Sequence, residues 1–263
     1  MDIDIGFWLS LALAITLVIW GLDKALKLSK QEGRLASVVE GSNSLISVFL
    51  VVLVIRSFIV EPFTIPSGSM LPTLQVNDFI LVNKFAYGLR LPVTNTKIIE
   101  TGQPERGDVM VFKFPENRNQ NFIKRVVGLP GDEIKIRDNR LFINGELITR
   151  NLVREGDNGR FWQSEYIETL GEVDHFIWQE GKVNPFTGKK VSNMAIEGEW
   201  TVPENAFFVM GDNRDNSNDS RVWGIVPDEL VMGEAFLIWM HWKPIFSLPS
   251  FSRNGAIDKV EAN

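Results

Sequence analysis

A short turn rich in serine and proline is the first segment whose residues could do chemistry, residues 63–74 (FTIPSGSMLPTL). Pro66 and Pro72 restrict the backbone on both sides of Ser69, because a proline ring fixes its own φ and limits the residue before it. A serine exposed on such a stiff turn suits nucleophilic attack. Clusters of Pro, Ser and Gly more often form plain loops, so this segment alone leaves Ser69 as a candidate nucleophile.

A lysine within an apolar segment, residues 122–132 (FIKRVVGLPGD), is the second candidate. On a strand Lys124 and Arg125 lie on opposite faces, each between apolar neighbours. Periodicity does not choose between them, but arginine stays protonated, whereas a desolvated lysine can lose its proton near neutral pH. Such a shift of roughly 2–3 pKa units requires roughly 3–4 kcal/mol, which burial can supply. Lys124 is therefore the candidate base; the alternative is a strand-edge lysine with its amine in water.

A dense polar loop follows an apolar strand at residues 210–224 (MGDNRDNSNDSRVWG). A calcium loop starting at Asp215 fails, because Ser220 stands where a glycine is needed and no glutamate follows at the twelfth position. The remaining alternatives are a solvated turn and a network of carboxylates, amides and hydroxyls that orients a nearby base.

Composition excludes several other chemistries. The net charge is -6 with no basic stripe in the globular part, so we expect no nucleic-acid partner. The chain has no cysteine, which excludes disulfides and thiolate chemistry. His175 and His241 stand far apart and no HExxH pattern exists, so we expect no metal and no other cofactor.

Two apolar runs near the N-terminus, residues 5–22 and 41–60, predict two transmembrane helices. Arg56 lies near the end of the second run, where an arginine can reach the interface. A cleaved signal peptide and a buried core helix are the alternatives; the acidic start and the lack of a small-x-small site oppose the first. Four basic residues lie in the loop 23–40, so the positive-inside rule places this loop in the cytoplasm and residues 61–263 outside.

Residues 61–263 predict a mainly β domain of antiparallel, barrel-like sheets, with short apolar runs separated by turn signals. Tight turns are expected at Asp138-Asn139, Asn144-Gly145 and 130–132. Residues 150–200 differ in composition and predict an inserted lobe or long hairpin, in which no chemical constellation is evident. The expected strands are Phe79–Val82, Val109–Phe112, Phe122–Val127, Leu141–Ile143 and Phe207–Met210.

Three segments, IPSGSMLPTL, FIKRVVGLPGD and GDNRDNSNDSR, follow two N-terminal spans in this order and closely resemble the sequence boxes of bacterial type I signal peptidases. The resemblance extends from Arg56 to about Gly233, except in the lobe. It implies Ser69 as nucleophile, Lys124 as general base, Ser67 and the Ser69 N–H as oxyanion donors, and Ser217 as the hydroxyl that orients the Lys124 amine. It also implies a supporting salt bridge and apolar pockets for small P1 and P3 residues (A-x-A). The supporting residues are Asp219 and Arg221 with Arg125 nearby, and the pocket residues are Phe63, Ile65, Pro66, Leu74, Ile80, Val111, Phe122 and Ile123.

Phe122 stands where relatives often have tyrosine, which should leave the pocket apolar. The implied activity is removal of signal peptides from exported preproteins at the outer face of the bacterial inner membrane, with preproteins and the lipid bilayer as partners. Aromatic residues in 236–242 and 246–251 suit that interface; a core strand followed by a packed tail is the equal alternative. A self-cleaving repressor of the serine–lysine class and a membrane-anchored binding module with a dead site are the competing functions.

Overall fold

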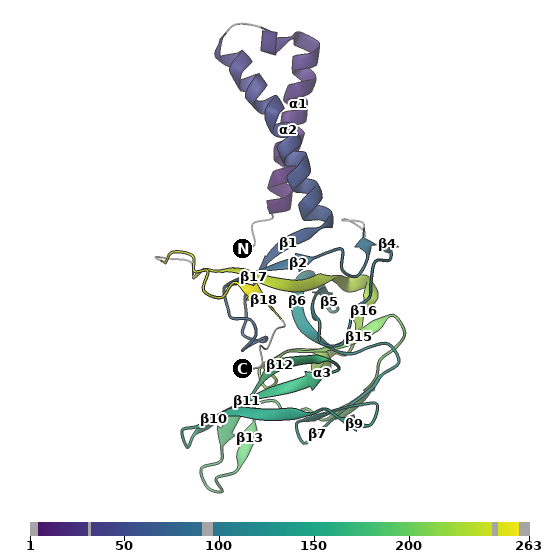
Figure 1. The fold of residues 1–263 in the computed structure, drawn as a ribbon, viewed down its shortest axis with the longest axis vertical. Helices are drawn as coiled ribbons and strands as arrows, with labels where there is room; N and C mark the ends of the chain where they lie inside the picture. Colours follow the sequence, from purple (N-terminus) through teal and green to yellow (C-terminus); the bar gives the residue numbers. More distant parts are fainter. Residues whose placement is uncertain (1–4, 31–32, 91–96, 244–246, 258–263) are drawn as a thin grey trace. The chain divides into compact units, whose positions relative to one another are not determined.

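The computed structural model of the protein describes residues 5–30, 33–90, 97–243 and 247–257. The chain divides into two compact units, Met1–Glu61 and Pro62–Asn263. The first holds the two long helices and the second holds nearly all of the strands (Figure 1).

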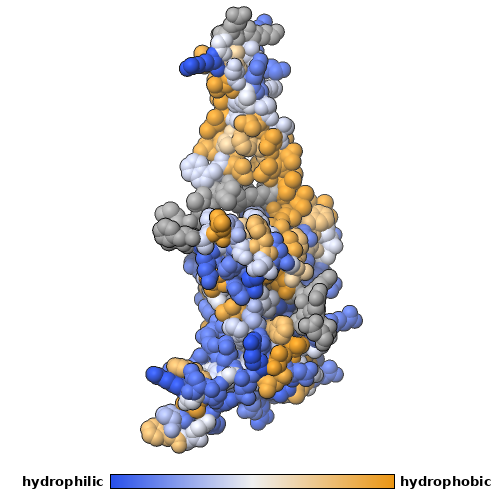
Figure 2. All heavy atoms as spheres, turned by 60° about the vertical axis from the view of Figure 1, so that its left-hand side comes forward, coloured by the Kyte–Doolittle hydropathy of each residue, from blue (hydrophilic) through white to orange (hydrophobic). Residues whose placement is uncertain are grey.

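The N-terminal unit consists of two long helices, α1 (Ile5–Leu26) and α2 (Arg34–Phe58), joined through the short 3-10 helix η1 (Leu28–Lys30). Both helices are long and apolar enough to cross a membrane. Only 6% of the apolar stretch of each helix is buried, which argues against the alternative that these are core helices. Figure 2 shows apolar residues gathered over these helices. The side chain of Arg56 lies outside the described residues.

Helix α2 begins at Arg34, before the apolar run starts at residue 41. Residues 34–40 (RLASVVE) contain no glycine or proline to interrupt a helix, so the helix extends back to the Gly33 N-cap. The connection between the two helices is therefore shorter than the predicted loop 23–40. Asp23 closes this connection, because its carboxylate accepts from the Ser29 N–H at 2.7 Å and from Asn43 Nδ2 at 3.0 Å.

The main sheet of the second unit has eight strands, with β18 pairing to β17 beside the path β1-β2-β17-β5-β6-β15-β16. The described strands form an open sheet and no closed barrel, so the antiparallel prediction is confirmed and the barrel-like shape is corrected. Its strands are β1 (Val60–Thr64), β2 (Asp78–Asn83), β5 (Val109–Phe114), β6 (Asn117–Gly128), β15 (Ala206–Met210), β16 (Val226–Pro227), β17 (Val231–His241) and β18 (Gly255–Ala256).

The other strands form three smaller sheets, ordered β10-β11-β12-β13, β14-β7-β8-β9 and β3-β4. Two short helices complete the unit, α3 (Ser220–Trp223) and the 3-10 helix η2 (Asp228–Leu230). The strands are β3 (Leu89–Arg90), β4 (Lys97–Ile99), β7 (Glu133–Arg137), β8 (Arg140–Ile143), β9 (Glu146–Leu147), β10 (Arg150–Asp157), β11 (Phe161–Leu170), β12 (Val173–Val183), β13 (Lys190–Ser192) and β14 (Gly198–Thr201).

Strand β5 lies at the centre of the core, because its alternate residues enter different apolar clusters. Val109 and Val111 join one cluster, and Met110 and Phe112 join another. Both faces of the strand are thus covered, and β5 pairs Met110 with Lys124 of β6 in antiparallel register. The core therefore fixes the position of the candidate base.

The structure adds detail to the turns and the lobe that the sequence predicts. Asn144 and Gly145 have φ of 52° and 84°, the positive values that a tight hairpin turn needs. The lobe is the four-stranded sheet β10–β13, which contains the long hairpin β11–β12. The lobe ends before residue 200, because β14 does not belong to this sheet but pairs with β7.

The aromatic run near the C-terminus belongs to strand β17, as the core-strand alternative expected. Beyond it, Trp242, Leu248 and Phe251 expose large parts of their side chains, while Phe246 lies outside the described residues. His241 is structural: its Nδ1 lies 2.7 Å from Oδ1 of the fully buried Asp78. Arg253 also binds that carboxylate, at 3.0 Å, and so ties the tail to β2.

Candidate active site

Ser69 and Lys124 meet at the centre of the site, 55 residues apart in the chain. Lys124 Nζ lies 2.7 Å from Ser69 Oγ, and also 2.7 Å from the carbonyl oxygen of Ile123. Ser69 comes from the turn after β1, and Lys124 comes from the buried end of β6. A nucleophile and a base at this distance can exchange a proton directly.

The amine of Lys124 is held in an environment that disfavours its charge. The residue is 4% exposed, and Phe122 presents its ring 5.4 Å from Nζ. Burial lowers the pKa of Lys124 from 10.5 to about 8, against the opposing pull of the carboxylates of Asp219 and Asp212. Desolvation is therefore the cause that makes a neutral amine accessible near neutral pH.

An open cavity of about 640 Å³ leads to the two residues. Ser67 lines it, and its hydroxyl lies 3.5 Å from Ser69 Oγ. Ser67 is exposed, whereas Ser69 is buried, so Ser67 lies on the open side of the nucleophile. Its role as an oxyanion donor stays a prediction.

The backbone of the nucleophile turn is held by Asn213, from the polar loop after β15. The N–H of Asn213 donates to the carbonyl of Ser69 at 3.1 Å, and its Nδ2 donates to the carbonyl of Gly68 at 3.0 Å. Two bonds from one residue thus orient the two peptide groups that carry the nucleophile. Asn213 was not singled out in the sequence, since a polar residue in a polar loop carries no distinguishing pattern.

Ser217, Asp219 and Arg221 are buried residues of this loop. Asp219 accepts from Arg221 Nε and Nη2, both at 2.8 Å, and from the Gly211 N–H at 2.9 Å. Burial alone would raise the pKa of Asp219, but Arg221 and these hydrogen bonds hold it below its usual value. The Asp219–Arg221 salt bridge expected from the sequence is therefore present.

Ser217 is 1% exposed and packs tightly beside Gly211: a Cβ on that glycine would lie 2.2 Å from Ser217 Oγ and 2.4 Å from the carbonyl oxygen of Ser69. Only glycine fits there. The Ser217 hydroxyl has no hydrogen-bond partner of normal geometry among the described residues, although it is close enough to Asp219 to help lower the pKa of that carboxyl. It lies beside the nucleophile turn, where its role as the orienting hydroxyl stays a prediction.

Arg125 does not join the Asp219–Arg221 pair but forms one of its own with Asp212. Its Nε and Nη2 donate to the two oxygens of Asp212 at 2.9 and 2.8 Å, and Nη1 donates to the carbonyl of Gly107 at 2.6 Å. Thr73 adds a hydrogen bond to Asp212 at 2.5 Å. Because both charged groups are fully buried, each satisfies the other, and the pair ties β6 to the polar loop.

The residues expected to line the substrate pockets divide into two groups. Pro66, Phe122 and Ile123 line the cavity in front of Ser69. The remaining five lie in or against a single apolar cluster of the main sheet, and four of them are at most 2% exposed. Those five are Phe63, Ile65, Leu74, Ile80 and Val111.

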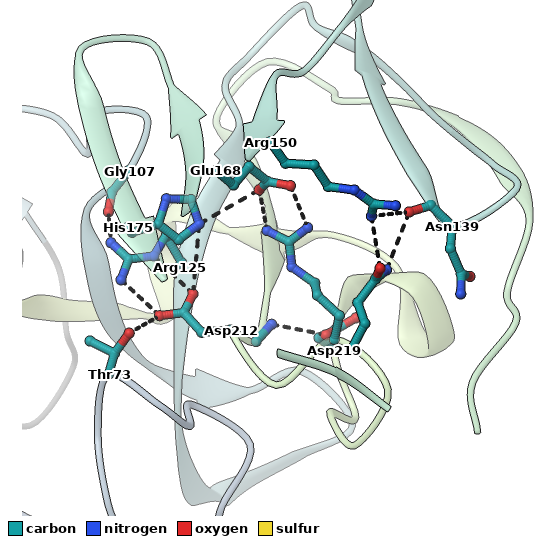
Figure 3. A network of polar contacts seen from close by, with 12 residues as sticks. Thr73, Gly107, Arg125, Asn139, Arg150, Glu168, His175, Asp212 and Asp219 are labelled. Carbon is teal, nitrogen blue, oxygen red and sulfur yellow. Dashed lines mark hydrogen bonds and ion pairs between the residues drawn. The ribbon is translucent and has the colours of Figure 1, made fainter. Parts of the chain in front are cut away.

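The lobe contributes charged residues that were not foreseen. Glu168 on β11 accepts from Arg214 Nη1 at 2.9 Å and from its Nη2, and the ring of His175 on β12 lies between Glu168 and Asp212 (Figure 3). Burial, with help from Arg125, lowers the pKa of His175 to about 3, so the ring is neutral. The sequence did contain a sign that Glu168 is buried. On a strand it shares a face with Trp162 and Leu170, which is an unusual position for a carboxylate.

Comparisons with known proteins agree with this site. The family described as signal peptidase, peptidase S26, matches residues 38–242. A signal peptidase I of Pseudomonas aeruginosa is 50% identical over 234 residues, which cover 83% of this chain and 79% of that protein. One from Pseudomonas fluorescens is 51% identical over 232 residues, with the same coverage, and one from Buchnera aphidicola is 42% identical, covering 76% of this chain and 74% of that protein. The chain thus belongs to the signal peptidase family, peptidase S26, whose serine–lysine enzymes remove signal peptides.

Proposed function

We propose that Ser69 is the nucleophile and Lys124 the general base of a signal peptidase I reaction. The observation that carries this assignment is the distance of 2.7 Å between Lys124 Nζ and Ser69 Oγ, with the lysine 4% exposed. Membership of the signal peptidase family favours this activity over a self-cleaving repressor or a binding module with a dead site. With a pKa of about 8, about a tenth of the Lys124 amines are neutral at pH 7, which is enough to support turnover.

Acylation begins when neutral Lys124 accepts the hydroxyl proton of Ser69 as Oγ attacks the scissile carbonyl carbon. The negative charge that develops on the carbonyl oxygen is stabilised by the Ser67 hydroxyl and the Ser69 N–H, and one such donor typically contributes roughly 3–4 kcal/mol. The Lys124 ammonium then donates its proton to the leaving amine. The C–N bond breaks, and the signal peptide stays attached to Ser69 as an ester.

Deacylation repeats the same transfers with water. Lys124, neutral again, accepts a proton from a water molecule whose oxygen attacks the ester carbonyl. When this second tetrahedral intermediate collapses, the proton returns from Lys124 to Ser69 Oγ, and the signal peptide leaves with a free carboxylate. Asp219 and Asp212 raise the proton affinity of Lys124 enough to let it hold the proton between these steps.

The site suits cleavage after small-x-small sequences. Part of the cavity wall near Ser69 is formed by the apolar side chains of Pro66, Phe122 and Ile123, which suit small apolar residues better than charged ones. Five further apolar residues of the predicted pockets belong to or pack against the apolar cluster of the main sheet, and four of them are buried. An extended substrate beside a strand edge would present alternate side chains to such pockets.

The expected topology brings this site to its substrate. Two N-terminal helices are candidate spans, and Lys24, Lys27 and Arg34 flank their connection. By the positive-inside rule the connection lies in the cytoplasm, and Pro62–Asn263 lies on the outer side of the bacterial inner membrane. Signal peptides end their apolar stretch near that surface, so preproteins would arrive with the cleavage site beside the membrane.

The decisive test is cleavage of a purified preprotein with an A-x-A site by the full-length protein in detergent, beside Ser69→Ala, Lys124→Ala and Lys124→Arg. We expect product from the parent only, because Lys124→Arg keeps the charge but cannot act as a base. Lys182→Ala, an exposed lysine on β12, is the matched control and should cleave as the parent does.

Thermal unfolding of each variant, followed in the same detergent, verifies that loss of activity is not loss of structure. Cleavage by Ser69→Ala or by Lys124→Arg at the parental rate would refute the assigned roles. If the folded parent does not cut the preprotein, the proposed activity itself is wrong.

A further inference from the structure

The lobe is bonded along one side of the polar loop that follows β15. The Trp178 N–H on β12 donates to the carbonyl of Asp212 at 2.9 Å, and the Arg214 N–H donates back to the carbonyl of Trp178 at 2.8 Å. Together they form a short parallel bridge between Trp178 and Asn213. The backbone of the loop is thus fastened to a strand edge of the lobe.

Side chains extend this attachment to residues 214–216. Asp215 accepts from the Glu180 N–H at 2.8 Å, and Asn216 donates to the Glu180 carboxylate. The strongest contact is the buried, two-pronged pair of Glu168 and Arg214, in which neither side chain is more than 6% exposed. Residues 212, 214, 215 and 216 therefore all bond directly to the lobe, and Asn213 is bridged to Trp178.

The opposite side of the same segment faces the reacting groups. Asn213 donates to the carbonyls of Ser69 and Gly68, and Asp212 binds Arg125, the residue after Lys124. The segment 212–216 therefore lies between the lobe and the catalytic pair. A displacement on the lobe side would be passed to both Ser69 and Lys124 through bonds of about 3 Å.

We propose that Glu168, acting through Arg214, is a positioning residue for the Ser69–Lys124 pair, and that the hairpin β11–β12 holds segment 212–216 against the nucleophile turn. This inference rests on the proposed function and gives the lobe, for which the sequence suggested no role, a place in the reaction. Glu168 touches neither Ser69 nor Lys124; it acts by fixing the residue next to Asn213 in the chain.

The charges around the Glu168–Arg214 pair indicate which measurable property would change if the pair were lost. Arg214 and Arg125 are balanced by Glu168 and Asp212, and the neutral ring of His175 lies among them (Figure 3). Asp212 and Asp219 raise the pKa of Lys124 and also act on Arg214, and Arg221 is the remaining charged group that acts on the amine. Without the Glu168 charge, Arg214 would turn toward these two carboxylates and weaken their hold on the protonated amine, so the pKa of Lys124 would fall.

The test compares full-length Glu168→Gln with Glu172→Gln, which makes the same change at an exposed position in the turn between β11 and β12. For Glu168→Gln we expect kcat to fall about 10-fold to 100-fold with KM within about 3-fold, since a small misplacement of reacting groups costs this much. The acid limb of the kcat–pH profile should move to lower pH by about half a unit or more. A loss of folded protein would lower kcat without moving the limb.

Two further measurements separate this proposal from the proposed function. The rate at which an activated acyl ester modifies Ser69, read by mass spectrometry, reports nucleophile activation without a preprotein, and it should fall in Glu168→Gln and not in Glu172→Gln. Glu168→Asp, which keeps the charge one methylene short, should restore the parental pH limb and part of kcat. A parent that acylates but does not cleave would count against the proposed function alone.

If Glu168→Gln keeps the parental kcat, acylation rate and pH limb, the positioning role is wrong. The same conclusion follows if kcat falls while the pH limb stays in place and the loss matches the unfolded fraction. Should Glu168→Gln fail to fold, Glu168→Asp decides: a several-fold lower kcat at unchanged KM supports the proposal, and the parental kcat refutes it.

Discussion

The ring of Phe122 lies flat against the ring of Phe114, with centroids 4.3 Å apart and planes 5° from parallel. Trp223 packs edge-on against Phe114 at 5.8 Å, so three rings from β5, β6 and α3 form one wall. Nζ of Lys124 lies 5.4 Å from the Phe122 ring. Phe122, which also lines the cavity, thus covers one side of the Lys124 amine.

Replacing Phe122 with alanine should therefore raise the pKa of Lys124. Without the ring, water reaches the amine and the desolvation that lowers its pKa is partly lost. We expect the acid limb of the kcat/KM–pH profile to move to higher pH and kcat/KM at pH 7 to fall at least about 10-fold. Phe122→Tyr, which keeps the ring and its stacking, is the control; a limb that stays in place in Phe122→Ala would contradict this account.

The pH profile of the parent tests the base itself. Burial lowers the pKa of Lys124 to about 8, and only the neutral amine accepts the serine proton. The rate should therefore rise with pH through about 8 and level off above it. Steady-state kinetics from pH 6 to 10 on a preprotein will measure the limb, and a limb near 10.5 would show that the amine is solvated.

Ser67→Ala removes one predicted oxyanion donor. Ser67 is exposed on the cavity rim, so its loss should leave thermal stability unchanged. Loss of such a donor typically lowers kcat by about 10² to 10³, because the interaction forms with the charge that develops in the transition state. KM should change little. An unchanged kcat would leave the Ser69 N–H as the principal donor.

Asp212→Asn should destabilise the protein strongly, since it leaves the fully buried guanidinium of Arg125 without its counter-charge. The expected loss is about 3–5 kcal/mol in the free energy of unfolding. Glu229→Gln alters a pair with Arg118 in which both side chains are more than 60% exposed, and it should change stability little. Equal effects of the two substitutions on unfolding would refute the importance of burial here.

Acid should destabilise the fold through His175. Its pKa is about 3 in the folded protein and 6.5 in the reference state, so the unfolded chain binds the extra proton between these values. The contribution to stability is complete above pH 6.5 and is lost as pH falls toward 3, at up to about 1.4 kcal/mol per pH unit. His175→Gln removes this group, and its thermal unfolding should depend less steeply on pH between 6 and 4. Parallel curves for parent and variant would contradict the assignment.

Much of the site was predictable because its chemistry is local. A stiff serine turn, an apolar strand with a lysine and a polar loop are each visible in short segments, and the structure brings Ser69 and Lys124 together. The strands that form short apolar runs were found as well, β2, β5 and β15 among them.

What could not be predicted depends on long-range register. Glu168 and Arg214 are 46 residues apart, and they meet only because β11 and β12 pair Glu168 opposite His175 and the edge of β12 reaches the polar loop. No single segment carries that information. Likewise β14 resembles its neighbours in composition, and its partner β7 lies far upstream in the chain.

Lys124 and Arg125 are adjacent on strand β6, and the pairing of the strand determines which of the two side chains faces Ser69. Opposite β5, Met110 faces Lys124 and Val109 faces Arg125; opposite β15, the register shifts between Phe208 and Val209 just before Met210 reaches Arg125. A slip of one residue would exchange the two faces and offer Ser69 a guanidinium that cannot give up its proton. The side chain that reaches Ser69 therefore depends on how β6 is aligned with its neighbours as well as on the presence of the lysine.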